Sequence, residues 1–173
     1  FLGTAGSAVA LAPFRALAQE LPPAETPGVE VPPGQIEKAV GALEEIISQL
    51  NTLGGTHGVG YFHLIEDRIV GLKVRGVYEN PAAHILIKAH KNLEQLVSTR
   101  EENELKTILD QKWAYLCYGA KYFEPVMDNI RAYINEQNKK VSGNVTVRLY
   151  KGNCEVVALT SPNSLFDENL ATF

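Results

Sequence analysis

Glu66-Asp67-Arg68 sets two carboxylates beside a guanidinium, between two short runs of apolar residues. Adjacent carboxylates can do acid–base work, or they can pair with a cationic group. The flanking runs, 61–65 and 69–74, are rich in β-branched and aromatic residues and predict the two strands of a hairpin. We therefore expect the charged residues at the tip of this hairpin, where an ordinary polar turn is the alternative explanation.

A second candidate group follows in the stretch 73–81, Lys-Val-Arg-Gly-Val-Tyr-Glu-Asn-Pro. It joins polar and aromatic side chains where a strand gives way to a helix. Such junctions often hold ligands, because a rigid scaffold aims the side chains of its loops. A ligand role for this stretch and a plain strand-to-helix connection are both open at this point.

Four glycines within residues 54–60 form the densest glycine cluster of the chain. Glycine permits the close backbone approach that a phosphate cradle needs. A cradle runs from strand to loop to helix, so that the helix N-terminus faces the anion. Here the predicted order is helix, loop, strand, and no Gly-Lys-Ser/Thr follows. We favour a structural turn over a phosphate site.

Metal chemistry has little support in the sequence. The histidines lack the i,i+4 spacing of a helical metal pair, and the two cysteines stand far apart without a CxxC pattern. We expect no metal site from these residues, which are His57, His63, His84, His90, Cys117 and Cys154.

Composition narrows the class of protein. The chain has 173 residues, of which 45% are apolar and 21% charged, as in ordinary globular proteins. Lys and Arg number 16 and Asp and Glu 20, so the formal net charge is 16 − 20 = −4. An acidic protein has no bulk attraction to phosphate backbones, so we expect no nucleic-acid partner. No run of roughly 18 uncharged apolar residues is present, so we expect no conventional membrane span.

The composition changes twice along the chain, which predicts three regions. Residues 1–19 are an Ala-rich segment ending in Ala16-Leu17-Ala18, which is typical of the end of an export leader, although a trimmed Ala-rich terminus explains it equally well. Residues 20–34 hold five prolines and predict an extended linker. Residues 35–173 carry regular helix and strand patterns and form the predicted folded domain.

Within residues 35–173, helices and hairpins alternate. Apolar residues at helical spacing predict a helix from Ile36 that ends at Gly54-Gly55, a second after Pro81 and a third over 101–118. A fourth begins at Pro125, and we expect it to bury Val126, Ile130, Tyr133 and Ile134. Alternation over 145–150 and 154–159 predicts a second hairpin. The fold class is therefore α+β, with a mainly antiparallel sheet and packed helices.

The motifs taken together resemble, in order, those of the argininosuccinate synthase family, from about Glu44 to Phe173. Several of them are long, and their order is that of the family, so the resemblance is specific. The matching segments are 53–60, 65–68, 73–81, 89–90, 99–101, 114–118, 141–143, 149–152, 161–162 and 164–166.

The resemblance covers the second half of that family's chain, the synthetase and multimerisation domain. It implies an enzyme that uses ATP to activate the ureido oxygen of citrulline, after which the amino group of aspartate displaces AMP. The family's ATP-binding domain carries a Ser-Gly-Gly-Leu-Asp-Thr-Ser loop, and this chain has no such sequence. We therefore expect no ATP or other cofactor bound by this chain alone, and no catalytic residue in it.

Two residues of this chain match substrate-binding positions of the family. Glu66 matches the glutamate of the family's Val-Glu-Asn-Arg motif and Tyr78 the tyrosine of its Arg-Gly-Ile/Val-Tyr-Glu motif, and the resemblance implies that both hold citrulline. They can meet only if the chain folds back after Gly76 or if Glu66 lies within a longer strand. The departures Val74, Tyr61 and His63 replace a serine, an arginine and an aspartate, so we expect lost polar groups around the site.

Two functions follow from the resemblance. The first is a partial argininosuccinate synthase that contributes citrulline-site and oligomerisation surfaces in the cytoplasm and is not active alone. The second is a non-catalytic relative, reused as an exported or assembly-bound structural subunit. Both imply a homo-oligomer or a larger protein assembly.

Overall fold

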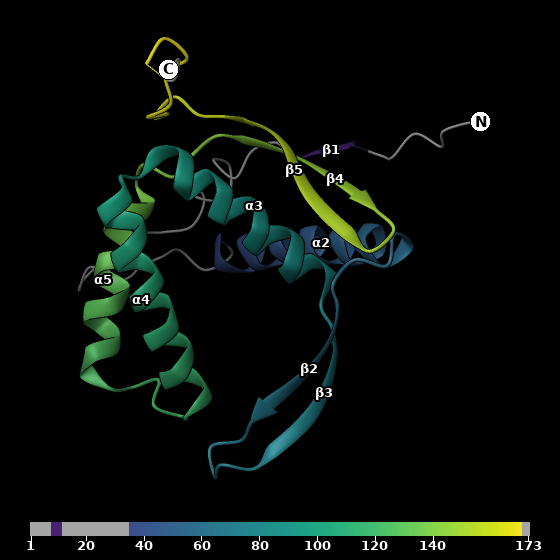
Figure 1. The fold of residues 1–173 in the computed structure, drawn as a ribbon, viewed down its shortest axis with the longest axis vertical. Helices are drawn as coiled ribbons and strands as arrows, with labels where there is room; N and C mark the ends of the chain where they lie inside the picture. The colour runs from purple at the N-terminus through teal and green to yellow at the C-terminus, as the bar shows by residue number, and fades with distance from the viewer. Residues whose placement is uncertain (1–7, 12–34, 171–173) are drawn as a thin grey trace.

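The computed structural model describes residues 8–11 and 35–170 (Figure 1). The leader-like pattern at 16–18 and the linker 20–34 lie outside these residues. Within these residues, four helices and two antiparallel sheets confirm the α+β class. The elements in chain order are β1 (Ala8–Leu11), α2 (Gln35–Thr56), β2 (Tyr61–Asp67), β3 (Lys73–Glu79), α3 (Pro81–Val97), α4 (Arg100–Tyr118), α5 (Pro125–Asn138), β4 (Asn144–Tyr150) and β5 (Asn153–Thr160).

The larger sheet has the strand order β1-β4-β5. The predicted hairpin of β4 and β5 is confirmed, and Val145, Val147 and Leu149 are buried on one face of β4. Strand β1 lies in the segment that we expected to be leader-like, and it pairs antiparallel with β4, with Ala8 opposite Arg148. The sequence did not predict this strand.

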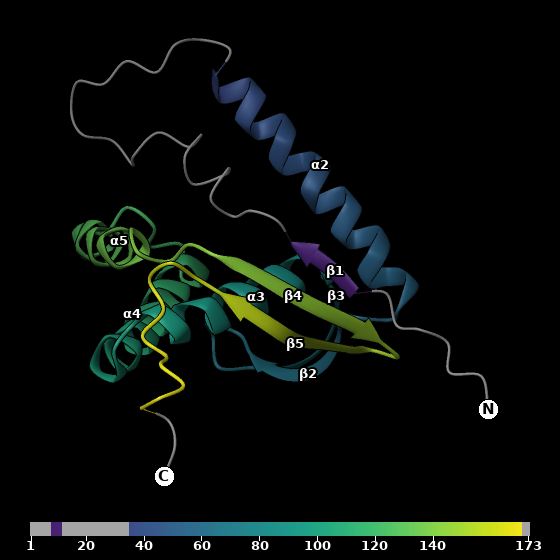
Figure 2. The ribbon, with the colours of Figure 1, turned by 90° about the horizontal axis from the view of Figure 1, so that it is seen from above.

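The main core lies where α3 packs against the larger sheet and against α2. Residues of α3 at helical spacing, Ile85, Ala89 and Leu93, are almost fully buried there. A smaller core joins α4 and α5, which lie side by side at the end of the molecule away from α2 (Figure 2). None of the helices in residues 35–170 combines the length and apolar content needed to cross a bilayer.

The predicted buried face of α5 is partly wrong. Val126 is exposed, whereas Met127 and Ile130 are buried against α4. The contact face of α5 follows residues 127, 130 and 134, which a helix places on one side. Val126 therefore lies off this face.

Helix α2 does not end at the two glycines, as the sequence predicted, but continues through them to Thr56. Gly54 serves close packing instead: a Cβ on it would come within 2.5 Å of the Pro81 Cβ. The amides of His57, Gly58 and Val59 all donate to carbonyls of Gly54 or Gly55. These donors are used within the turn, which agrees with a structural role for the cluster.

The tip of the β2–β3 hairpin is also displaced from its predicted position. The amide of Gly71 donates to the carbonyl of Arg68 at 2.7 Å, and the amide of Arg68 donates to the carbonyl of Leu72 at 2.9 Å. Gly71 has φ +82°, a left-handed conformation that glycine adopts without strain, and it closes a short loop over residues 69–71. Glu66 and Asp67 consequently lie within β2, and apolar Ile69 and Val70 occupy the tip.

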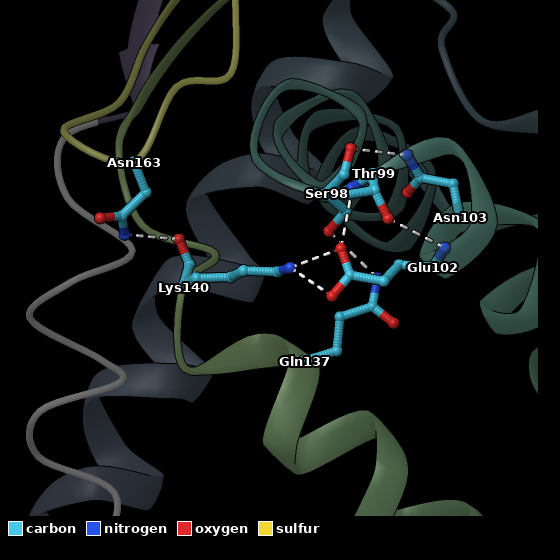
Figure 3. Close-up of polar contacts among 7 residues, drawn as sticks. All are labelled: Ser98, Thr99, Glu102, Asn103, Gln137, Lys140 and Asn163. Carbon is cyan, nitrogen blue, oxygen red and sulfur yellow. Dashed lines mark hydrogen bonds and ion pairs between the residues drawn. The ribbon is translucent and has the colours of Figure 1, made fainter.

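Polar side chains hold the corner between α3 and α4 (Figure 3). Thr99 and Glu102 form a capping box at the start of α4. The Lys140 Nζ lies 2.6 Å from the Glu102 Oε2, and the Gln137 amide donates to the Ser98 hydroxyl at 3.1 Å. These contacts tie the corner to the end of α5. They set the direction of α4, whose far end lies on the same side of the molecule as the β2–β3 hairpin (Figure 1).

Candidate functional site

The β2–β3 hairpin has two faces with different chemistry. Its register sets Phe62 opposite Tyr78 and Glu66 opposite Val74. Because side chains alternate along a strand, residues 62, 64, 66, 74, 76 and 78 share one face, which we call the Glu66 face. The opposite face carries residues 61, 63, 65, 67, 73, 75, 77 and 79, all of which are exposed.

On the Glu66 face, the two residues singled out by the resemblance meet. The Tyr78 hydroxyl donates a hydrogen bond of 2.8 Å to the Glu66 Oε1. The contact is diagonal, since Tyr78 lies four residues beyond Val74, the partner of Glu66 in the register. Of the two arrangements considered above, the structure has Glu66 within a longer strand.

Gly76 makes this diagonal contact possible. A Cβ on Gly76 would lie 2.5 Å from Cε2 of Tyr78 and 3.2 Å from its hydroxyl oxygen. The tyrosine ring therefore lies along the strand, over the space that a side chain would fill. The chain does not fold back after Gly76, which lies inside the straight pairing of β3 with β2.

Arg68 joins the pair electrostatically. Its Nη2 lies 3.4 Å from the same Oε1 of Glu66. The hydrogen bond to Glu66 raises the pKa of the Tyr78 phenol above its ordinary value of about 10, and the charge of Glu66 adds to the shift, while Arg68 opposes it. Tyr118, at the end of α4, contributes in the same direction as Glu66. Tyr78 is thus a neutral donor at physiological pH.

The two neighbouring acids do not form a carboxylate pair. Asp67 belongs to the opposite face, where one of its oxygens lies 2.6 Å from the Nζ of Lys73. Acid–base chemistry by adjacent carboxylates is therefore not what this geometry offers. A carboxylate, a phenol and a guanidinium on one face can instead bind and orient a polar or ionic ligand.

Only one of the three departures from the family lies on the Glu66 face. Val74 stands directly opposite Glu66. Tyr61 and His63 lie on the opposite face, where His63 contacts Arg75. Tyr61 and His63 therefore do not share a face with Glu66, because side chains alternate along the strand.

Sequence reasoning missed two parts of this site. The sequence pattern placed Arg68 at the tip of the hairpin. Arg68 lies two residues after Glu66, and side chains two residues apart in a strand point to the same face. Gly76 was read as a possible bend, although a glycine two residues before a tyrosine leaves room for the ring. Groups of three or more His, Cys, Asp or Glu side chains that could hold a metal ion are not found among residues 8–11 and 35–170.

A separate cavity of about 740 Å³ lies between α3 and α4, and neither Glu66 nor Tyr78 lines it. Its walls include Ile87 and Trp113, and its floor holds Glu94 and Lys106, whose charged atoms lie 3.1 Å apart. Burial opposes the charge of Glu94, but the hydrogen bond and charge of His90 and the charge of Lys106 outweigh it and lower its pKa. The Glu94 Oε1 forms ion pairs with His90 and Lys106, so these charges offset one another.

The sequence of this chain is similar to sequences of known proteins, and the matched region includes the hairpin motifs. The family model described as Arginosuccinate synthase C-terminal domain matches residues 28–173. Argininosuccinate synthase of Methanococcoides burtonii is 46% identical over 129 residues, which are 75% of this chain and 33% of that protein. The proteins of the same name from Pyrococcus furiosus and Streptococcus mutans are 48% and 47% identical over 131 residues, 76% of this chain.

The chain spans about a third of the length of these curated relatives. The matched region contains the whole Glu66 face, the helices and the β4–β5 hairpin. The chain therefore belongs to the argininosuccinate synthase family, and it corresponds to the C-terminal domain of those proteins.

Proposed function

We propose that this chain forms part of an argininosuccinate synthase and supplies a citrulline-binding surface and subunit contacts, without being active alone. The observation that supports the proposal is the hydrogen bond between Tyr78 and Glu66, the two residues at the family's citrulline-binding positions. The bond holds the carboxylate in place before a ligand arrives, which reduces the entropy cost of binding.

The role of this surface is positioning. The carboxylate of Glu66 accepts hydrogen bonds from the α-ammonium of citrulline, and the phenol of Tyr78 fixes the carboxylate. Activation of citrulline by ATP, and attack by aspartate, belong to the complete enzyme. We expect no turnover of citrulline, aspartate and ATP by the 173-residue chain by itself.

Calorimetric titration with citrulline tests the proposal. We expect the wild-type chain to bind citrulline at millimolar concentration and Glu66→Gln to abolish binding, since the amide lacks the charge that pairs with the ammonium. Asp67→Asn is the matched control, because it removes a neighbouring charge on the opposite face. Absence of binding by the wild type, or equal binding by Glu66→Gln, would reject the citrulline site.

A structural subunit of an assembly is the alternative, and the hairpin tip favours it. Ile69, Val70 and Leu72 are 69%, 78% and 66% exposed. Clustered exposed apolar side chains often mark a protein–protein contact. The native mass of the protein, measured together with the proteins that copurify with it, separates the two functions. An ATP-binding chain in the complex supports the cytoplasmic enzyme. An unrelated assembly supports the structural role, in which the subunit is either exported or bound to that assembly.

A further inference from the structure

Strand β1 covers one edge of a strand that carries much of the core. In the sheet order β1-β4-β5, β4 lies in the middle, and β1 lies along it on the side away from β5 (Figure 2). Val145, Val147 and Leu149 of β4 are each at most 2% exposed. If β1 left, β4 would become an edge strand beside this core, and the backbone amides and carbonyls on that edge would lose their partners.

The cover that β1 provides is short. Its residues 8–11 pair with residues 145–148, whereas β4 itself runs over Asn144–Tyr150. Residues of an antiparallel strand direct their amides alternately to one neighbour and to the other, so about half of the β4 amides at 145–148 face β1. The long connection 12–34 joins β1 to α2 and supplies an effective concentration of about millimolar at best. Another strand can therefore compete with β1 for this edge.

The segment that contains β1 has a simple chemistry. Residues 1–14 contain no charged side chain, and β1 itself is Ala-Val-Ala-Leu. Uncharged small and aliphatic residues suit an added strand, in which main-chain hydrogen bonds supply the affinity. The pattern Ala16-Leu17-Ala18, which is typical of the end of a leader, follows β1 in the sequence. Cleavage after Ala18 would break the covalent tie between β1 and the rest of the domain.

We propose that the edge of β4 away from β5 is a strand-docking site, which residues 8–11 occupy as a removable intramolecular cover. The ligand of this site is an extended, uncharged segment of small and aliphatic residues that adds a strand antiparallel to β4. The site is separate from the Glu66 face, since β2 and β3 form a different sheet. Loss of residues 1–18 therefore opens a docking edge without altering the residues of the hairpin.

Proline substitution in the full chain tests the cover. Proline lacks the amide donor, and adjacent strand residues face opposite sides, so Val9→Pro combined with Ala10→Pro removes one donor toward β4. We expect the β4 amides that face β1 to exchange at least about tenfold faster in NMR-detected hydrogen exchange. The β4 amides that face β5 should stay protected. Gly3→Pro combined with Thr4→Pro is the matched control, because it adds two prolines outside β1.

A synthetic peptide tests whether the edge accepts a strand from outside. Residues 5–13, added as a peptide at about millimolar concentration to the variant with prolines at 9 and 10, should restore the protection of the same amides. The same peptide carrying both prolines should not restore it. Unchanged exchange in the variant, or no rescue by the peptide, would overturn the docking site. Equal loss of protection on the side of β5 would also overturn it, since residues 8–11 would then stabilise the whole sheet and not one edge.

Discussion

The two hairpins of this protein have similar lengths but different surroundings. In β4–β5, three residues of one strand are buried against α3, and β1 covers the outer edge of β4. In β2–β3, Gly76 is the one buried residue of either strand, and the hairpin projects from the body of the molecule (Figure 1). An isolated two-stranded hairpin is at best marginally stable in water. The packing that stabilises the fold therefore lies around β4–β5, whereas the candidate ligand-binding residues lie on β2–β3.

The β2–β3 hairpin is fixed mainly at its base. The amide of Asn80 donates to the carbonyl of Gly60 at 2.9 Å, and the ring of Phe62 lies 5.1 Å from the ring of His84. The Glu66 face lies further out, where few packing contacts constrain it. The contact between Tyr78 and Glu66 is therefore part of what orders this end of the hairpin.

The largest expected effect tests where the stability lies. Leu93→Ala should lower the free energy of unfolding by about 2–5 kcal/mol, because it leaves a cavity in the core beneath β4 and β5. Ile65→Ala, on the exposed face of β2, should change it by no more than about 0.5 kcal/mol. Urea denaturation measures both, and equal losses would remove the contrast between the hairpins.

Gly76→Ala should separate binding from stability. The new Cβ occupies the space of the Tyr78 ring, so the hydroxyl moves away from Glu66 and citrulline affinity should fall about tenfold, or about 1.4 kcal/mol. The melting temperature should change little, since the core lies elsewhere. Gly55→Ala is the control, because its Cβ meets no atom within 4 Å, and unchanged citrulline affinity in Gly76→Ala would contradict the proposed role of the ring.

A smaller effect is expected at the corner of α3 and α4. Glu102→Gln weakens the capping box and removes the charge that pairs with Lys140, and should cost about 1 kcal/mol of stability. Glu104→Gln, which disrupts only an exposed pair with Arg100 in the same helix, should cost less than about 0.5 kcal/mol. Hydrogen exchange should rise at the start of α4 and stay unchanged in β2–β3; a rise in the hairpin would show that the two regions are coupled.

The pH dependence of stability should be the smallest of these effects. Hydrogen bonds from Lys140 and from the Thr99 backbone lower the pKa of Glu102 from its ordinary value of 4.5. Its contribution is therefore present above about pH 4.5 and is lost as the pH falls through the lower pKa of the folded state. When the unfolding midpoint is measured at decreasing pH, stability should fall less steeply in Glu102→Gln than in Glu104→Gln. Identical profiles of stability against pH would contradict a lowered pKa for Glu102.

Much of the fold could be predicted from local patterns. Pro81 and Pro125 begin helices where proline is tolerated, and the alternation of Val145, Val147 and Leu149 marks a buried strand face. The turn that separates β2 from β3 could not be placed in this way, because Ile69 and Val70 have strong strand propensity. A single glycine, Gly71, decides the position of the loop.

The residues of the candidate site could be predicted from the sequence, but their arrangement in space could not. Glu66 and Tyr78 were found through the family motifs, whereas their contact depends on the register of two strands and on the missing side chain of Gly76. The apolar stripe of α2 shows the same limit. Val40 and Ile47 follow the spacing of a buried face and are nevertheless exposed, since periodicity does not tell what covers a helix.

Tyr78 and Glu66 form one hydrogen-bonded pair on an exposed hairpin. This hydrogen bond can be tested directly by NMR titration of the ¹³C-labelled tyrosine ring carbons, with Tyr78→Phe to assign the signal. We predict that the pKa of Tyr78 lies above the ordinary value of about 10 in the wild type and falls toward it in Glu66→Gln. A Tyr78 signal that titrates near 10 in the wild type, or is unaffected by Glu66→Gln, would contradict the hydrogen bond.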